Sequence, residues 1–258
     1  MKALDCLELY EDAEFYDTEF ATREVEIPFY RKYARLAGGP VLEVACGTGR
    51  ITLPIARDGV DVTGLDVSRP MIEQARRKSA AECLSVTWIE QDCWDMRFDR
   101  TFALVFSATN AMQHLLDLES VCAFLQSARR ALAPDGESIL DVFNPDPAKL
   151  ARTSAARYVH KTITLPGGED IRVETASHYH ADTQVLHFDL FYLRGGRLLR
   201  TKHVNMRCFF PEELLVLCRF NGLEVVKRFG NYDEVEFSGG SSKQILICRP
   251  APFLNNPR

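Results

Sequence analysis

Hydrophobic positions divide the first part of the chain into short apolar runs and longer amphipathic stretches. An apolar run bounded by glycine or polar residues is typical of a buried parallel strand, whereas apolar positions spaced three or four apart are typical of a helix. This alternation predicts βαβ units and a parallel sheet. The predicted strands cover residues 41–45, 60–66, 85–90, 102–107 and 138–143. The predicted helices cover residues 27–36, 50–58, 71–81 and 118–132, the last closed by a turn at 133–136.

The pattern changes near residue 157, where longer strand-like segments follow one another without helices. Glycine pairs at 167–168 and 195–196 lie where hairpin turns are expected. These features predict an antiparallel β insertion, followed by a return to the first pattern. The predicted strands of the insertion cover 159–165, 171–180, 185–193 and 198–210, and a helix at 211–220 and strands at 223–229 and 244–248 complete the chain.

Composition and charge narrow the class of substrate. The chain of 258 residues has a formal net charge of −5 and no block of basic residues. Enzymes that act on nucleic acids usually carry a basic footprint, so we expect a small-molecule substrate and no nucleic-acid partner. No apolar run reaches the ~18 residues of a membrane span, and the N-terminus lacks an apolar signal core. We therefore expect no membrane partner and a cytoplasmic location.

The eight cysteines are dispersed, and none forms a C-x-x-C pair. Several lie inside apolar periodic segments, as Cys218 and Cys248 do. This distribution indicates free, buried thiols in a reducing compartment rather than a disulfide framework or a zinc site.

A glycine-rich segment, Glu43 to Gly49, lies between the first predicted strand and the following helix. Glycines at such a place allow a tight turn and a close approach of the backbone to a ligand. Asp66 ends the second predicted strand, 19 residues after Gly47. A carboxylate at that position accepts hydrogen bonds from both hydroxyls of a ribose. The alternative is a purely structural turn with an aspartate nearby by chance.

A dinucleotide-binding fold has the same two features, so a nucleotide-dependent oxidoreductase is an alternative. Its fingerprint needs a third glycine, whereas Thr52 occupies that place here. Glu43 also precedes the loop, and its carboxylate disfavours a pyrophosphate but favours a ligand that carries sulfonium and ammonium charges.

The segment from Glu43 to Gly49 resembles motif I of the class I, Rossmann-like methyltransferases that depend on S-adenosylmethionine, with Ala45 where the first glycine is commonest. Residues 64–71 resemble the second motif of that family, residues 91–94 its adenine-binding turn, and residues 106–110 the exit of its fourth strand. The hairpin insertion is similar to that of the small-molecule branch, such as glycine and amino-sugar N-methyltransferases.

The resemblance implies an α/β fold with a doubly wound, mostly parallel seven-stranded sheet, whose last strand is antiparallel. We expect three parts: an N-terminal cap with the cofactor-binding region (1–150), the antiparallel β insertion (151–210), and the C-terminal completion of the first part (211–258). The insertion is expected to act as a lid over the substrate or as a dimer contact, so a homodimer stays open.

The resemblance also implies roles for individual residues in holding S-adenosylmethionine. Asp66 would bind the ribose, Val67 and Met71 would pack on the adenine, and Asp92 would accept from the adenine amine beside the backbone of Cys93. Residues of the glycine loop, the fourth strand and the N-terminal segment would contact the methionyl part or orient the loop: Tyr16, Glu43, Ala45, Cys46, Gly47, Gly49 and Ser107.

His114 is the first candidate for a substrate contact or general base, because it follows the fourth strand at the carboxyl edge of the sheet and imidazole titrates near neutral pH. It could equally cap or pack the next helix. Asn110 is expected to polarise the substrate or to close the loop, and Tyr232 and Asp233 are weaker candidates for the mouth of the site. If an amine nucleophile loses its proton to solvent, no base is needed.

Two further patterns carry weaker signals. Residues 144–147, Asn-Pro-Asp-Pro, superficially resemble the Asn-Pro-Pro box of nucleic-acid amino-methyltransferases, but they follow the fifth strand instead of the fourth, so we predict a turn. His178, His180 and His187 lie on neighbouring predicted strands, where a hairpin would place His178 opposite His187. We identify no carboxylate or cysteine that completes a metal site, so we predict a polar sheet face and no metal.

The main prediction is therefore methyl transfer from S-adenosylmethionine to nitrogen or oxygen of a small molecule. One alternative is the oxidoreductase. The other is a non-catalytic module that binds S-adenosylmethionine without transferring its methyl group.

Overall fold

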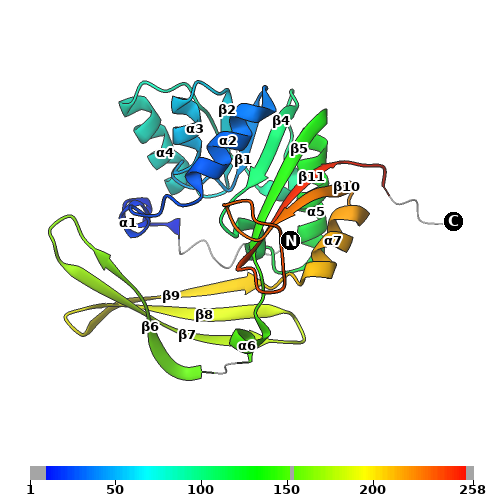
Figure 1. Ribbon diagram of the computed structural model, residues 1–258. Coiled ribbons are helices and arrows are strands. Elements are labelled where there is room, and N and C mark those ends of the chain that lie inside the picture. The colour runs from blue at the N-terminus through cyan, green and yellow to red at the C-terminus, as the bar shows by residue number, and fades with distance from the viewer. Residues whose placement is uncertain (1–9, 152–153, 254–258) are drawn as a thin grey trace.

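The computed structural model describes residues 10–151 and 154–253 of the chain. Figure 1 shows a seven-stranded sheet flanked by helices and, below it, a separate four-stranded sheet. Within the described residues, no helix combines the length and the apolar character needed to cross a membrane.

The large sheet has the strand order β10-β11-β5-β4-β1-β2-β3. β1, β2, β3, β4 and β5 pair in parallel, whereas β11 is antiparallel to both β5 and β10. The predicted doubly wound sheet with a reversed last strand is thus confirmed. Its strands are β1 (Val41–Val44), β2 (Val62–Asp66), β3 (Thr87–Glu90), β4 (Phe102–Ser107), β5 (Leu132–Phe143), β10 (Leu223–Phe229) and β11 (Lys243–Pro250).

Alternate residues of the central strands face opposite layers of helices. Leu104 and Ile139 pack with Tyr30 of α2 and Ile55 of α3, whereas the neighbouring Val105 and Leu140 pack with residues of α5 and α7. Both faces of the sheet are buried, which explains the continuous apolar runs of the sequence. The helices are α1 (Ala13–Glu19), α2 (Ile27–Ala37), α3 (Thr52–Arg57), α4 (Arg69–Ala81), α5 (Leu118–Ala131), α6 (Pro147–Leu150) and α7 (Pro211–Phe220), with the 3₁₀ turns η2 (Cys93–Asp95) and η3 (Ala111–His114).

The predicted turn at residues 133–136 is wrong in its assignment, because these residues belong to β5, which begins at Leu132. Phe102 pairs with Leu132, whereas Leu104 pairs with Glu137, so the turn-forming residues are accommodated as an irregularity within the strand. Gly136 fits there because a Cβ atom would lie 2.8 Å from the carbonyl oxygen of Phe102. These residues do follow the helix as predicted, but they form an irregular part of β5 instead of a turn between the helix and the strand.

The second sheet is antiparallel throughout, in the order β6-β7-β8-β9. Gly195 and Gly196 have φ angles of 54° and 82°, as the tight turn between β8 and β9 requires. The last strand ends at Arg207 instead of the predicted residue 210, because Phe210 caps α7. The strands are β6 (Ser154–Thr164), β7 (Asp170–His180), β8 (Val185–Arg194) and β9 (Arg197–Arg207).

One face of this second sheet packs toward the N-terminal segment and the carboxyl end of β5. Val204 and Met206 contact Tyr10 and Phe143, and Tyr192 lies in a cluster with Phe15. The carboxyl ends of the parallel strands and this inner sheet face therefore line a common cavity.

Candidate active site

The backbone of the loop after β1 is bent by residues in the left-handed region. Ala45, Gly47 and Gly49 have φ angles of 58°, 56° and 78°. Ala45 adopts this conformation despite its Cβ atom, at the position where the motif most often has glycine. The N–H groups of Cys46, Gly47 and Gly49 donate to protein acceptors, which holds the loop in this shape, and Ala45 and Gly47 border a cavity.

Gly49 serves a different purpose from the one expected from the sequence. A Cβ atom at this position would lie 2.6 Å from the indole of Trp88, and one at Gly64 would lie 2.4 Å from the same ring. These glycines therefore make room for Trp88, whose Nε1 donates to Ser79 of α4. The close approach at Gly49 is to the protein's own side chain and not to the cavity.

Asp66 connects the end of β2 to the glycine loop. Its Oδ2 accepts a hydrogen bond from the backbone N–H of Gly47 at 2.8 Å, and its Oδ1 accepts from the N–H of Ser68 at 2.8 Å. Burial raises the pKa of this carboxyl, and the backbone donors oppose that effect. The side chain also borders a cavity, so it can hold the loop and still present unused acceptor sites to a ligand.

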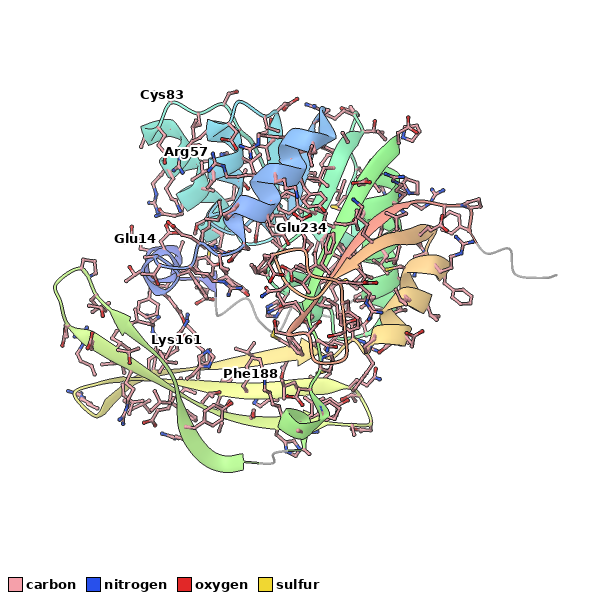
Figure 2. The ribbon with its side chains drawn as sticks, viewed as in Figure 1. Glu14, Arg57, Cys83, Lys161, Phe188 and Glu234 are labelled. Atoms are coloured by element: carbon pink, nitrogen blue, oxygen red, sulfur yellow. The ribbon has the colours of Figure 1, made fainter. Side chains whose placement is uncertain are left out.

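A cavity of about 260 Å³ lies between the large sheet and the inner face of the second sheet. Its wall combines the glycine loop, the ends of β2, β3 and β4, the helix α1 and strands β8 and β9. Figure 2 shows side chains between the two layers, among them Phe188 from β8. Of the residues predicted from the sequence, the wall contains Tyr16, Ala45, Gly47, Asp66, Val67, Asp92, Cys93 and His114.

Glu43 does not line the cavity, and its burial disfavours the charge expected for it. Its carboxyl group is buried and accepts a hydrogen bond from Thr52 at the start of α3. Burial raises the pKa of Glu43 to about 8, which favours the protonated form at pH 7. The residue therefore secures the loop to the helix and does not act as the anion that selects a cationic ligand.

Four other predicted residues lie behind the wall instead of on it. Met71, Ser107 and Cys46 are buried, with 0%, 3% and 5% of their surface exposed. Met71 and Ser107 lie on buried positions of α4 and β4, and Cys46 lies in the loop itself, so none of the three is placed to touch a ligand in the cavity. Asn110 is the fourth, and it belongs to a separate polar network.

This polar network is centred on Asp141, which is fully buried near the end of β5. Lys243 forms an ion pair with its Oδ1 at 2.7 Å and donates to Asn110 Oδ1 at 2.9 Å. The hydroxyl of Tyr232 donates to Asp141 Oδ2 at 2.7 Å. Burial raises the pKa of this phenol, and the neighbouring carboxylate of Asp141 raises it further. Both candidates, Asn110 and Tyr232, are thus engaged inside the network and not on the cavity wall.

The network fixes the loop that follows β4. Thr109 and Asn110 have φ angles of 51° and 70°, and the N–H of Thr109 donates to Asp141 Oδ2 at 2.9 Å. Such conformations persist where the surroundings compensate for their cost. Asp233, the other weak candidate, accepts from the N–H of Val235 at 3.2 Å and shapes its own turn.

His114 lies at the end of this same loop, in η3, and faces the cavity. Its Nε2 is 3.0 Å from the hydroxyl of Tyr10. Burial lowers the pKa of His114 to about 4, so the imidazole is neutral at pH 7. A neutral ring can accept or donate one hydrogen bond, but its low pKa makes it a weak general base.

This depressed pKa has a consequence for stability that can be measured. Between the unfolded value of 6.5 and about 4, the unfolded chain binds a proton at His114 that the folded protein does not. The free energy of unfolding of the wild type should therefore fall by about 2 kcal/mol more between pH 7 and pH 5 than that of His114→Gln. Urea denaturation of both proteins at each pH measures this difference; equal losses would contradict it.

Several polar residues of the cavity wall were not predicted from the sequence. Glu19 of α1 accepts from the hydroxyl of Tyr192 at 3.0 Å and forms ion pairs with Lys161 at 2.9 Å and Lys202 at 3.7 Å. Tyr192, Lys202 and Glu19 all line the cavity. They come from segments distant in sequence, so no local motif signals them.

Arg23 and Arg50 also line the wall beside Tyr16. Both guanidinium groups form ion pairs with the buried Glu26, which fixes Arg50 in place at 15% side-chain exposure. The hydroxyl of Tyr16 would lie 3.9 Å from a Cβ atom at Gly47, so this phenol covers the glycine loop. An aromatic ring, a bent loop and two cations thus surround one end of the cavity.

At another part of the cavity wall, Asp92 has an oxygen that needs a donor. Its Oδ1 is buried and has no hydrogen-bond partner among the described residues. Burial raises the pKa of this carboxyl. A buried acceptor without a partner costs free energy, and an amine of a bound ligand would satisfy it.

Comparisons with known proteins agree with this geometry. A family model described as a methyltransferase domain matches residues 41–136. The cypemycin N-terminal methyltransferase of a Streptomyces species is 29% identical over 82% of this chain and 83% of its own length. The CcbJ methyltransferase from Streptomyces caelestis has a structure that matches 96% of this chain and 99% of that chain, with a TM-score of 0.79 and 26% identity. These matches identify the protein as an S-adenosylmethionine-dependent methyltransferase with the class I fold.

The fold of this methyltransferase is shared with more distant relatives. The sugar N-methyltransferase KedS8 from a Streptoalloteichus species matches 92% of each chain with a TM-score of 0.69 at 19% identity. The resemblance drawn from the sequence motifs is confirmed, and the oxidoreductase alternative finds no support in these comparisons. In this methyltransferase, Thr52 occupies the place of the third glycine and donates to Glu43.

Proposed function

We propose that this methyltransferase transfers a methyl group from S-adenosylmethionine to nitrogen or oxygen of a small molecule held beneath the second sheet. The observation that carries the proposal is a single cavity walled on one side by the glycine loop and Asp66 and on the other by Phe188 and Val204. One wall suits the nucleoside cofactor, and the other is free to bind a different molecule.

The cofactor, when bound, supplies a methyl group on a positively charged sulfur. Asp66 would accept from its ribose hydroxyls through the lone pairs that Gly47 and Ser68 do not use. Asp92 Oδ1 would accept from the adenine amine and so gain the partner it lacks, with Val67 and Cys93 alongside.

The opposite end of the cofactor carries a carboxylate, for which the sequence analysis named no cation. Arg50 is the residue proposed to attract it, because its guanidinium is held at the cavity wall by Glu26. Tyr16 would cover the methionyl part from above the glycine loop, in agreement with its position over Gly47. The backbone of Ala45 lines the same side of the cavity.

The substrate side of the cavity is mostly apolar. Phe188 and Leu190 of β8 and Val204 and Met206 of β9 contribute to its wall. Positioning is the main task in methyl transfer, because holding the reacting atoms in line can contribute on the order of 7–11 kcal/mol. His114 would orient the nucleophile as a neutral hydrogen-bonding group, and Asn110 would keep its loop in place through Lys243.

We assign the second sheet the role of a lid, because its inner face already forms part of the cavity wall. The dimer contact remains the alternative role. The net charge of −5 favours a small-molecule substrate over a nucleic acid. A cytoplasmic location agrees with the free cysteines of the described residues; Cys6 lies outside them.

The proposed division of the cavity can be tested with Val204→Trp, which adds bulk on the substrate wall alone. The purified protein is incubated with S-adenosylmethionine and panels of amino sugars, amines and phenols, and release of S-adenosylhomocysteine is measured together with the mass of the product. For any accepted substrate, Val204→Trp should raise KM by about tenfold or more, since one poorly fitting group costs ~1–3 kcal/mol. The dissociation constant of S-adenosylhomocysteine should stay within about threefold.

The matched control is Leu199→Trp, which lies on the same strand with 45% of its surface exposed. Leu199→Trp should change neither the KM for the substrate nor the dissociation constant of S-adenosylhomocysteine. Tight cofactor binding without product from any panel would favour the non-catalytic module. Equal loss of cofactor and substrate binding in Val204→Trp would contradict the division of the cavity.

A further inference from the structure

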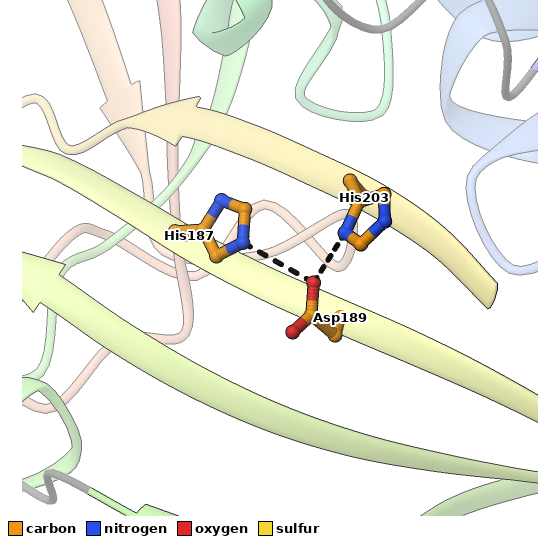
Figure 3. A group of neighbouring side chains, drawn as sticks. All are labelled: His187, Asp189 and His203. Carbon is orange, nitrogen blue, oxygen red and sulfur yellow. Dashed lines mark hydrogen bonds and ion pairs between the residues drawn. The ribbon is translucent and has the colours of Figure 1, made fainter.

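The outer face of the second sheet carries a cluster of metal-ligand side chains that methyl transfer does not use. His187 and Asp189 are two residues apart on β8, and His203 of β9 is paired directly with Asp189. The residues that alternate with them, Phe188 and Val204, face the cavity. The three side chains therefore lie on the face turned away from the cavity. Figure 3 shows them next to one another.

The potential ligand atoms of this cluster already converge. Asp189 Oδ1 is 2.5 Å from His203 Nδ1 and 3.2 Å from His187 Nε2. All three atoms lie within 4.8 Å of one another. In a tetrahedral zinc site with bonds of about 2.0–2.2 Å, neighbouring ligand atoms are roughly 3.3–3.5 Å apart, so only small side-chain rotations separate this cluster from such a site.

The hydrogen bond on the far side of His187 adds an independent argument. Its Nδ1 is 2.6 Å from Asn205 Oδ1, and because this oxygen can only accept, the ring must donate there. In a neutral imidazole the lone pair is then on Nε2, the atom that faces the Asp189 carboxylate. In this tautomer both potential ligand atoms, His187 Nε2 and Asp189 Oδ1, are turned toward each other, as a shared cation would require.

We propose that His187, Asp189 and His203 bind a divalent transition-metal ion on the outer face of the second sheet. Two imidazole nitrogens and one carboxylate oxygen form a donor set that suits Zn²⁺, with water in the fourth position. Asn205 would orient the His187 ring from outside the coordination shell, as partners of metal-bound histidines commonly do. The ion would link β8 to β9 directly behind the apolar wall of the cavity.

The cluster is open to such an ion. The side chains of His203, His187 and Asp189 are 60%, 36% and 31% exposed. The sequence analysis missed this site because it considered His178 as the partner of His187. The structure does pair these two residues, but the carboxylate and the third ligand come from Asp189 and His203.

The proposal is tested by titrating Zn²⁺ into the full-length protein after treatment with a chelator, at pH 8, where a model imidazole is neutral. Calorimetry should give saturable binding that is weakened more than about tenfold in His203→Ala and in His187→Ala. Asn205→Ala should weaken binding by about tenfold, because it removes only the orienting partner. Co²⁺ in place of Zn²⁺ should give visible absorption bands that the His203→Ala variant lacks.

The matched control is His180→Ala, a histidine of the neighbouring strand β7 that lies outside the cluster. It should bind Zn²⁺ as the wild type does, which separates this site from general binding by surface histidines and by the exposed thiol of Cys83. Circular dichroism of each variant checks that the sheet is formed. Absence of saturable binding to the wild type, or equal affinity in folded His203→Ala, would overturn the proposal.

Discussion

Replacing Asp141 with alanine is expected to lower the free energy of unfolding by about 3–5 kcal/mol, because the change leaves a buried cation without its partner. Lys243, with 11% side-chain exposure, loses its ion pair at 2.7 Å. The hydroxyls of Tyr30 and Tyr232 lose the acceptor that they share at 3.0 Å and 2.7 Å. The N–H of Thr109 loses the same acceptor, so the loop that leads to His114 loosens as well.

Urea denaturation at pH 7 measures this effect. Asp141→Asn keeps an oxygen acceptor and removes only the charge, so its loss should be smaller. Asp135→Ala, an exposed position on the same strand, should stay within about 0.5 kcal/mol of the wild type. A loss below about 1 kcal/mol in Asp141→Ala would contradict the idea that this network supports the loop.

Replacing Asp66 with alanine is expected to weaken binding of S-adenosylhomocysteine about 100-fold, which corresponds to roughly 3 kcal/mol. The carboxylate would lose its charge-assisted hydrogen bonds to the ribose, and the N–H of Gly47 would lose an acceptor that holds the loop. Calorimetric titration of both proteins measures the ratio of their dissociation constants.

The matched control is Asp61→Ala, just before the same strand. Its carboxylate is 60% exposed and pairs with Arg100, far from the cavity wall, so cofactor binding should be unchanged. If Asp66→Ala binds as tightly as Asp61→Ala, the ribose assignment is wrong. Comparing the melting temperatures of the two variants separates loss of binding from loss of fold.

The parallel sheet could be predicted because its signal is local. Strands buried on both faces appear as continuous apolar runs, and β1 and β4 show this directly. The segment 133–136 could not be assigned in the same way, because its turn residues occupy an irregularity whose existence depends on pairing with β4. Register is a property of two strands, and one strand alone does not reveal it.

The residues of the candidate site also differ in whether a local sequence pattern reveals them. Asp66 and the glycine loop are close in sequence and have a characteristic spacing, so the sequence could predict them as neighbours, and both border the cavity. Arg50 could not be predicted in this way, although it directly follows Gly49, because its role depends on Glu26 and Tyr16 from another segment. The charge of Glu43 could not be predicted from the sequence, since burial raises the pKa of its carboxyl and burial is a tertiary property.

The most direct test of the account is calorimetric titration of the folded wild-type protein with S-adenosylhomocysteine. We predict saturable binding at one site per chain, with competition by S-adenosylmethionine. Absence of both heat and saturation with either nucleoside would contradict the assignment of the glycine loop, Asp66 and Asp92 as a cofactor site.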